Sequence, residues 1–319
     1  MTPTVVVTRR IPADAIASLQ SFFTVDYNDA DEPLAREELL RRIRGADALV
    51  TLLTDRVDAD MLAAAPRLRV VANVAVGYDN VDVAAARDRG IAVTNTPGIL
   101  TDATADFAWA LLLAVARRVI EADRYVRDGR FLGWEMMGFW GGDLAGATLG
   151  IAGFGRIGQA VARRGRAFGM RVIYAARHRA PSAIEDESDA RLVDRETLFA
   201  HSDVLSLHLP LNAATRHYVG AAELAMMKRT AYLVNTARGP VVDEAPLATA
   251  LAEGRLAGAG LDVFEREPAV EPRLIGLPNV VLAPHIASAT PATRTKMALV
   301  AAENAIAAAR GLDPPNRVA

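Results

Sequence analysis

Cysteine is absent from this 319-residue chain, which excludes disulfides, thiolate metal sites and a cysteine nucleophile. Histidine is scarce, with five residues, so no metal centre is expected. An excess of one charge is also lacking. The 36 Lys and Arg residues against 38 Asp and Glu leave a net charge of −2. This balance gives no electrostatic reason to expect nucleic acid or an anionic membrane as a partner.

Long hydrophobic runs are lacking too. The longest, Phe107–Ala116, is half of the roughly 20 residues that a membrane span needs. The first ten residues show no basic segment followed by a long apolar core, so no secretory signal is predicted. We therefore expect a cytoplasmic protein. Hydrophobic residues make up 51% of the chain, enough for substantial cores, and its length suggests two domains.

Short apolar runs alternate with helical patterns in the first part of the chain. Strands are predicted at 4–8, 48–53, 68–74 and 91–94, with helices from about 13 and at 34–44, 58–64 and 81–89. After a break at 95–98, one long helix is predicted from Thr101 to about Asp128, because Phe107, Leu111, Val115 and Val119 recur at fourfold spacing. Such alternation predicts a parallel sheet with helices on both faces.

A second alternating series begins at Ala147. Its predicted strands are 147–152, 171–175, 203–207, 230–234, 257–262 and 280–282, and a final helix spans about 291–310. The sequence therefore predicts an α/β protein with two doubly wound parallel-sheet domains, in which the closing helix could return to the first domain.

A glycine-rich motif, GFGRIG at 153–158, follows the first strand of the second series and begins a helix that reaches Phe168. Strand before and helix after is the context that a dinucleotide fingerprint requires. The glycines allow the backbone to approach a pyrophosphate, and the helix N-terminus offers unpaired N–H groups. A purely structural turn is the alternative.

The next strand lacks the acidic residue that would bind the adenosine ribose of NAD(H). Arg177 and Arg179 follow it instead. Arginine suits a 2′-phosphate, so NADP(H) is predicted as the preferred cofactor, with NAD(H) possible. An ordinary solvated basic loop would show the same pattern of arginines without an acidic residue.

Arg238, Glu267 and His285 each lie in a short motif at the end of an apolar stretch. Ligands bind at the carboxyl ends of strands in such sheets. Reduction of a 2-keto acid requires a cation for the carboxylate and carbonyl, which Arg238 can supply, and a proton donor, which His285 can be. Glu267 would favour the imidazolium form and fix its orientation. Taken singly, each residue could instead be a surface charge or a loop histidine.

The remaining histidines carry no predicted catalytic role. His178, His201 and His217 are interpreted as surface or structural residues, and His208 could border the cofactor.

Several long motifs in this order resemble the D-isomer-specific 2-hydroxyacid dehydrogenase family, most closely its glyoxylate/hydroxypyruvate reductase branch. Besides the glycine motif and the three catalytic motifs, they include VVANVAVGYDNVD at 70–82 and TNTPGILTDATAD at 94–106. Two lookalikes fit less well: phosphite dehydrogenases carry a lysine near Val76, and formate dehydrogenases replace the glutamate.

The resemblance implies a flavodoxin-like substrate domain, 1–99 with 287–319, and a Rossmann NADP-binding domain, 100–286. It also implies a homodimer in which Trp134 reaches the partner's active site, although Trp134 could equally be an interface core residue. The implied substrate-binding residues are Leu53, Ala75, Val76, Gly77, Trp134 and Arg238. The implied cofactor-binding residues are Thr104, Gly153, Phe154, Gly155, Arg156, Ile157, Gly158, Ala176, Arg177, His178, Leu209, Pro210, Thr215, Thr236, Ala237, Arg238, Asp262, His285 and Ala287.

The function that the sequence favours is NADPH-dependent reduction of a small 2-keto acid, glyoxylate or hydroxypyruvate, to the D-2-hydroxy acid. Leu52, Leu53 and Val76 would form a small apolar wall suited to a short side chain. Two alternatives remain open: the same chemistry on larger keto acids, and a dinucleotide-sensing binding protein of the same fold.

Overall fold

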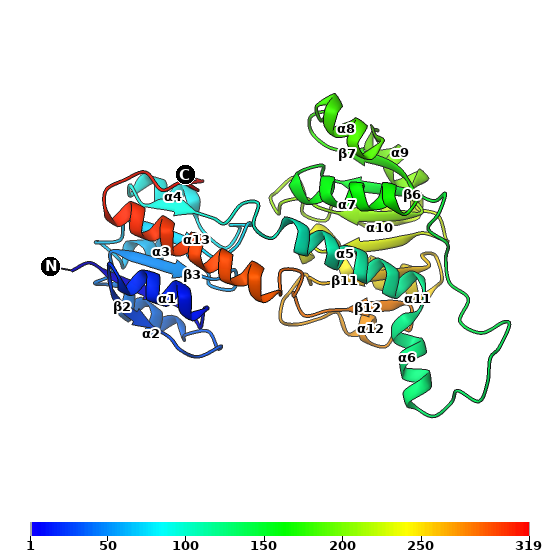
Figure 1. Ribbon diagram of the computed structural model, residues 1–319, viewed down its shortest axis with the longest axis horizontal. Coiled ribbons are helices and arrows are strands. Elements are labelled where there is room, and N and C mark those ends of the chain that lie inside the picture. Colours follow the sequence, from blue (N-terminus) through cyan, green and yellow to red (C-terminus); the bar gives the residue numbers. More distant parts are fainter. Residues whose placement is uncertain (1, 319) are drawn as a thin grey trace. The chain divides into compact units, whose positions relative to one another are not determined.

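The computed structural model describes residues 2–318 and divides into two compact units. Unit 1 contains the chain up to Leu100 and from Ala289 onward, and unit 2 contains Thr101–Ser288. Each unit is an α/β sandwich around its own parallel sheet (Figure 1). The predicted fold class is therefore confirmed.

Unit 1 contains a five-stranded parallel sheet in the order β2-β1-β3-β4-β5, the flavodoxin-like order. Its strands are β1 (Thr4–Val7), β2 (Thr24–Tyr27), β3 (Ala48–Thr51), β4 (Val70–Asn73) and β5 (Ala92–Thr94). Its helices are α1 (Ala13–Gln20), α2 (Arg36–Ile43), α3 (Ala59–Ala63), α4 (Val83–Asp88) and α13 (Pro291–Ala309). Strand β2 was not predicted, because this edge strand is only partly buried and lacks a continuous apolar run.

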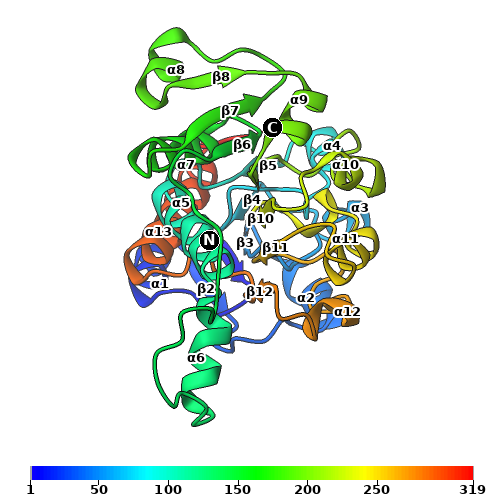
Figure 2. The same cartoon turned by 90° about the vertical axis from the view of Figure 1, so that its right-hand side faces the viewer.

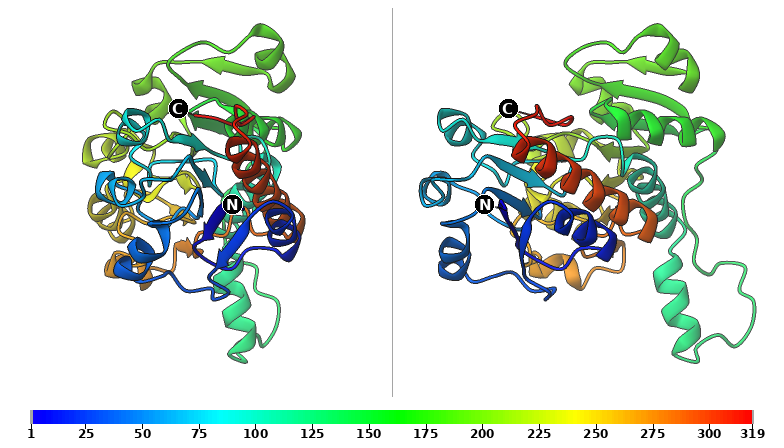
Figure 3. Two further views of the ribbon diagram at one scale, coloured as in Figure 1. Left: turned by 90° about the vertical axis from the view of Figure 1, so that its left-hand side faces the viewer. Right: turned by 60° about the vertical axis from the view of Figure 1, so that its left-hand side comes forward.

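Alternation along β1 distributes side chains to both faces of this sheet. Val5 and Val7 pack in the cluster that includes α1 and α13, whereas Val6 packs in the cluster that includes α2 and α3. Helix α13 lies against α1, so the last helix of the chain belongs to the unit that holds the first strand (Figure 3).

Unit 2 contains a seven-stranded parallel sheet in the order β12-β11-β10-β9-β6-β7-β8. Its strands are β6 (Thr148–Ala152), β7 (Arg171–Ala175), β8 (Ala190–Leu192), β9 (Val204–Leu207), β10 (Tyr232–Asn235), β11 (Gly258–Leu261) and β12 (Val280–Leu282). Figure 2 labels each of these strands except β9. The order reverses between β6 and β9, as in the Rossmann fold, where dinucleotides bind at the reversal. Strand β8, a three-residue edge strand, was not predicted.

Helices cover both faces of the second sheet. They are α5 (Thr101–Ala116), α6 (Val119–Arg127), α7 (Arg156–Ala167), α8 (Ser182–Ser188), α9 (Arg195–His201), α10 (Ala221–Met226), α11 (Glu244–Ala252) and α12 (Pro272–Ile275), with a 3₁₀ turn at Gly239–Val241. Helices α5 and α7 pack on one face, and α9, α10 and α11 pack on the other.

The prediction of one continuous helix over 101–128 is wrong. Arg118 adopts the left-handed conformation, with φ of 53°, which ends the regular hydrogen-bond ladder and separates α5 from α6. Val119, which the fourfold spacing placed on the buried face, is 49% exposed. No residue of α6 is buried, and α6 with the loop after it extends away from the sheet of unit 2 (Figure 1).

Across residues 2–318, no helix combines the length and the apolar character that crossing a membrane would require.

Candidate active site

The glycine-rich turn lies between β6 and α7, at the reversal of strand order. Gly153 has φ of 91°, and a Cβ there would lie 2.5 Å from the carbonyl oxygen of His208. A Cβ on Gly158 would lie 2.2 Å from the oxygen of Gly153. Gly155, the N-cap of α7, faces open space. Glycine is therefore required at 153 and 158 for packing, while Gly155 leaves room at the helix N-terminus for a pyrophosphate.

A second observation supports a dinucleotide at this edge of the sheet. The hydroxyl of Thr236, directly after β10, is buried and has no hydrogen-bond partner among residues 2–318. Such an orphaned group is unusual in a folded protein and is what a bound ligand would satisfy. Leu209 after β9 lies against the Gly153 turn, and Thr215 donates its hydroxyl to the carbonyl of Pro210, which shapes the same loop.

The basic loop after β7 has its two arginines in different situations. Arg179 is bound to Glu185 at 2.8 Å, and Glu185 also accepts the hydroxyl of Tyr174 at 2.6 Å. Arg179 is thus already engaged in an ion pair. Arg177 and His178 are exposed, and Arg177 has no hydrogen-bond or ion-pair partner within residues 2–318.

Arg238 follows β10 in extended backbone, with φ of −148°. The buried side chain of Asn235 holds this turn: its Nδ2 donates to the Arg238 carbonyl at 3.0 Å, and its Oδ1 accepts from Ala237 N–H at 3.0 Å. The next residue, Gly239, packs directly on the backbone of Phe264, where a Cβ would lie 1.8 Å from the carbonyl carbon. The turn that carries Arg238 therefore rests on the segment that carries Glu267.

Glu267 and His285 form an ion pair, with 3.0 Å between Oε2 and Nδ1. The other oxygen of Glu267 accepts the N–H of Phe264 at 3.0 Å. Burial raises the pKa of Glu267, but the hydrogen bond and charge of His285, with smaller contributions from Phe264 N–H and Arg238, bring the pKa below its ordinary value. The carboxylate of Glu267 is therefore charged at neutral pH. It interacts electrostatically with both His285 and Arg238, so the three side chains form one group.

Asp262 supports the loop that carries His285. Its carboxylate accepts the N–H groups of Ile286 at 2.7 Å and Ala287 at 2.8 Å, and its carbonyl accepts that of His285 at 2.8 Å. These bonds hold His285 in the left-handed region, with φ of 56°. Burial raises the pKa of Asp262, and the two N–H donors offset this only in part. The resemblance implied Asp262 as a cofactor-binding residue, and the sequence showed no sign of this supporting role, which no local pattern reveals.

His208 lies beside the cofactor turn. Its Nε2 is 2.8 Å from the hydroxyl of Ser206, and burial lowers the pKa of His208 to about 3. A neutral imidazole at working pH suits a structural group better than a proton donor. Thr104, in the first turn of α5, is also buried.

The predicted substrate residues outside unit 2 follow the strands of the first sheet. Leu53 comes after β3, and 75–77 come after β4. The carbonyls of Ala75, Val76 and Gly77 accept hydrogen bonds from Thr96 N–H, Asn95 Nδ2 and Asn73 Nδ2 respectively. These bonds fix the turn at 75–77. The N–H groups of the same three residues have no acceptor among the described residues. Trp134 lies in the loop after α6 and is 80% exposed.

The site combines a Rossmann-type turn with an ion-paired glutamate and histidine at the carboxyl ends of one sheet. This combination is typical of one class of proteins, the nicotinamide-dependent oxidoreductases. A model of the D-isomer specific 2-hydroxyacid dehydrogenase NAD-binding domain matches residues 109–287. The chain is 53% identical to the glyoxylate reductase of Thermococcus litoralis, over 100% of this chain and 97% of that one.

Two solved structures have the same fold along their whole length. A crystal structure of a Thermus thermophilus protein matches with TM-score 0.92 and 46% identity, covering 99% of this chain and 100% of that one. An NADPH-dependent glyoxylate/hydroxypyruvate reductase from Sinorhizobium meliloti, in complex with NADP and malonate, matches with TM-score 0.87 and 34% identity, covering 100% and 97%. The chain belongs to the D-isomer specific 2-hydroxyacid dehydrogenase family and is an NAD(P)-dependent oxidoreductase.

Proposed function

We propose that this protein reduces small 2-keto acids, glyoxylate first and hydroxypyruvate second, to 2-hydroxy acids with NADPH. The observation that carries the proposal is the Glu267–His285 ion pair, held beside Arg238 on the sheet that carries the dinucleotide turn. The names of the relatives, glyoxylate reductase and glyoxylate/hydroxypyruvate reductase, support the substrate class.

In this proposal His285 is the proton donor. Because its Nδ1 faces Glu267, Nε2 is the nitrogen that can donate to the ketone oxygen. NADPH, held at the glycine turn, would supply the hydride that the carbonyl carbon accepts. The proton that leaves His285 completes the hydroxyl group, and solvent then returns a proton to the imidazole. Glu267 keeps the ring oriented through its contact with Nδ1.

Arg238 in unit 2 is proposed to bind the substrate carboxylate, and the turn at 75–77 in unit 1 separately offers N–H groups suited to an anion. Arg238 is always charged and can bind two oxygens. The free N–H groups of Ala75, Val76 and Gly77 form an anion-binding concavity whose shape is held from behind by three carbonyl hydrogen bonds. Unit 1 is thus the substrate domain and unit 2 the cofactor domain, and Leu53 with Val76 favours a short substrate side chain.

NADPH is preferred over NADH because the loop after β7 offers cations and no acid. Arg177 is exposed and has no internal partner within residues 2–318, so it can bind a 2′-phosphate without breaking an existing ion pair. His178 and the backbone of Ala176 lie beside it. The Sinorhizobium meliloti relative, which was solved with NADP, supports this preference.

We further propose a homodimer built through α6 and the loop after it. This segment exposes an unusual set of large apolar side chains, which are Val119, Ile120, Val126, Phe131, Leu132, Trp134, Met136, Met137 and Trp140. Leu132 is 95% exposed, and large apolar side chains exposed together in one segment are typical of an interaction site. A second copy of the chain would cover it, with Trp134 contributing to the partner's substrate pocket.

The test is NADPH oxidation followed at the absorbance band of the reduced nicotinamide, with glyoxylate, hydroxypyruvate, pyruvate and phenylpyruvate, each also with NADH. Fast oxidation of NADPH by the two smallest polar acids is expected. A preference for NADH would refute the cofactor assignment alone, and a preference for phenylpyruvate would refute the small-substrate assignment. Tight NADPH binding with no turnover of any acid would refute the enzyme proposal in favour of a sensor.

A further inference from the structure

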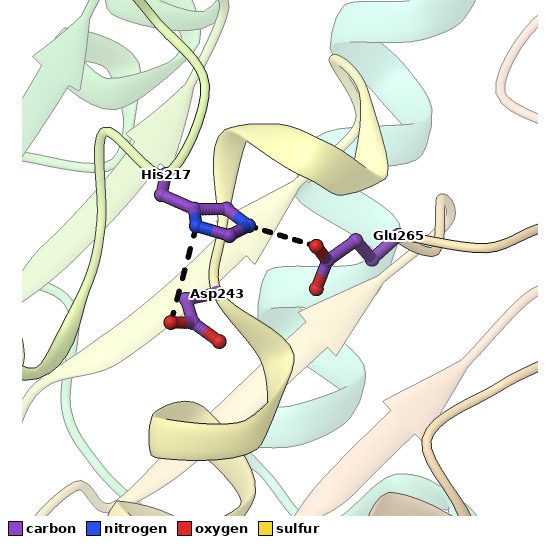
Figure 4. A group of neighbouring side chains, drawn as sticks. All are labelled: His217, Asp243 and Glu265. Carbon is purple, nitrogen blue, oxygen red and sulfur yellow. Dashed lines mark hydrogen bonds and ion pairs between the residues drawn. The ribbon is translucent and has the colours of Figure 1, made fainter.

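A histidine outside the three catalytic residues lies between two carboxylates in unit 2 (Figure 4). The Nε2 atom of His217 is 2.8 Å from Oε1 of Glu265, and its Nδ1 atom is 4.0 Å from Oδ2 of Asp243. The same Oε1 of Glu265 lies 3.2 Å from a guanidinium nitrogen of Arg216. Neither the proposed reaction nor the cofactor site uses these residues.

The position of His217 joins the segments that carry Arg238 and Glu267. Its backbone N–H donates to the carbonyl of Pro240 at 2.8 Å, two residues after Arg238. Val219 pairs with Val242 in a parallel bridge, which extends this backbone contact. The imidazole meanwhile binds Glu265, two residues before Glu267. One residue thus contacts both segments, one through its backbone and the other through its side chain.

Glu265 depends on this contact because it lies among other acids. Its N–H donates to the buried carboxylate of Glu244 at 2.7 Å. Burial raises the pKa of Glu244, the N–H of Glu265 offsets this in part, and the negative charge of Glu265 raises it again. Without the imidazole, Glu265 would face Glu244 and Asp243 with only Arg216 as a counter-charge. Repulsion would then act on the backbone of 264–267, whose Phe264 N–H binds Glu267.

Two carboxylates and an imidazole can also bind a metal ion, but these groups are already paired. The carboxylates face different ring nitrogens, as Figure 4 shows, and Oε1 of Glu265 is shared by His217 and Arg216. Hydrogen bonds and ion pairs within the protein therefore complete this network, which favours a positioning role over a metal site.

We propose that His217 is a positioning residue that holds the segment 264–267 so that Glu267 keeps its contact with His285. This inference rests on the proposed function, because the consequence is slower proton delivery by His285. A change in the side chain of His217 should leave the segment that carries Arg238 in place. His217 contacts that segment through its backbone N–H, which every variant retains.

The experiment compares His217→Ala, His217→Gln and the control His201→Ala, which removes an exposed histidine from α9. Since His217 has φ of 51°, both of its variants place a side chain in the same left-handed backbone, so they differ mainly in the donor to Glu265. For His217→Ala we expect kcat to fall about 10- to 100-fold with KM for glyoxylate nearly unchanged. The solvent deuterium isotope effect on kcat should rise, His217→Gln should recover most of the loss, and the control should match the unmodified enzyme.

Three results would overturn the proposal: His217→Ala behaving like His201→Ala, a rise in KM at constant kcat, or no recovery in a folded His217→Gln. A readout without turnover separates this proposal from the reaction itself. The carboxyl carbon of Glu267, followed by NMR as pH is lowered, should titrate at higher pH in His217→Ala than in the unmodified protein. If the unmodified protein reduces no keto acid, the proposed function fails, while this titration still supports or refutes the role of His217.

Discussion

Replacing Glu267 by Gln removes one negative charge and preserves almost the whole shape of the side chain. The glutamine oxygen can still accept the N–H of Phe264, so the local fold should persist. What is lost is the charge that faces His285 Nδ1 at 3.0 Å, between side chains that are 31% and 23% exposed. A charge-assisted hydrogen bond of this kind contributes about 1.5–3 kcal/mol. At 1.36 kcal/mol per factor of ten, kcat should fall roughly 10- to 150-fold.

The pH dependence of this loss provides a sharper test. The pKa of Glu267 lies below its ordinary 4.5, so the native carboxylate stays charged across an assay range of about pH 5.5 to 8. The variant lacks this charge at every pH. We therefore expect the rate deficit, measured with NADPH and glyoxylate, to stay nearly constant across this range and to shrink only as the pH falls through the lowered pKa of Glu267. Glu196→Gln, an exposed change on α9, serves as the control. Full activity in Glu267→Gln, or a deficit that already vanishes within this assay range, would refute the assigned role.

Three further predictions follow from single sites. Arg177→Ala should raise KM for NADPH about 10-fold or more and leave KM for NADH unchanged, and steady-state kinetics showing equal changes would contradict phosphate binding there. Gly239→Ala should sharply lower the melting temperature because a Cβ would lie 1.8 Å from the carbonyl carbon of Phe264, whereas Gly133→Ala, with nothing within 4 Å, should not. Hydrogen bonds from two arginines of α2 hold the pKa of Glu38 at about 2, below its ordinary 4.5. Its stabilising contribution is therefore complete above pH 4.5 and lost as pH falls through about 2. Urea unfolding should show Glu38→Gln less stable than the native protein near neutral pH, with the difference vanishing at low pH.

Much of the architecture was predictable because local patterns and tertiary packing agree. The buried strands β1, β3, β4, β6 and β9 are predominantly apolar, and they lie within two residues of the predicted ranges. The edge strands β2 and β8 were missed because both are partly exposed and neither contains a continuous apolar run. The break at Arg118 was also missed, since a left-handed residue within an apolar periodic stretch leaves no compositional mark.

The sequence by itself determined the chemistry that this protein can offer: a glycine turn, an arginine, a glutamate and a histidine at strand ends, and a basic loop without the ribose-binding acid. Only the tertiary structure decided how these groups are held. Arg179 binds Glu185 and leaves Arg177 exposed, Asp262 binds the loop of His285, and His217 joins segments far apart in the chain. Local patterns encode strands, helices and turns, because these arise from neighbouring residues. Asp262 and Ile286 are 24 positions apart, and His217 and Glu265 are 48 apart. Such partners meet only when the sheet brings strand ends together, so their pairing depends on the completed fold.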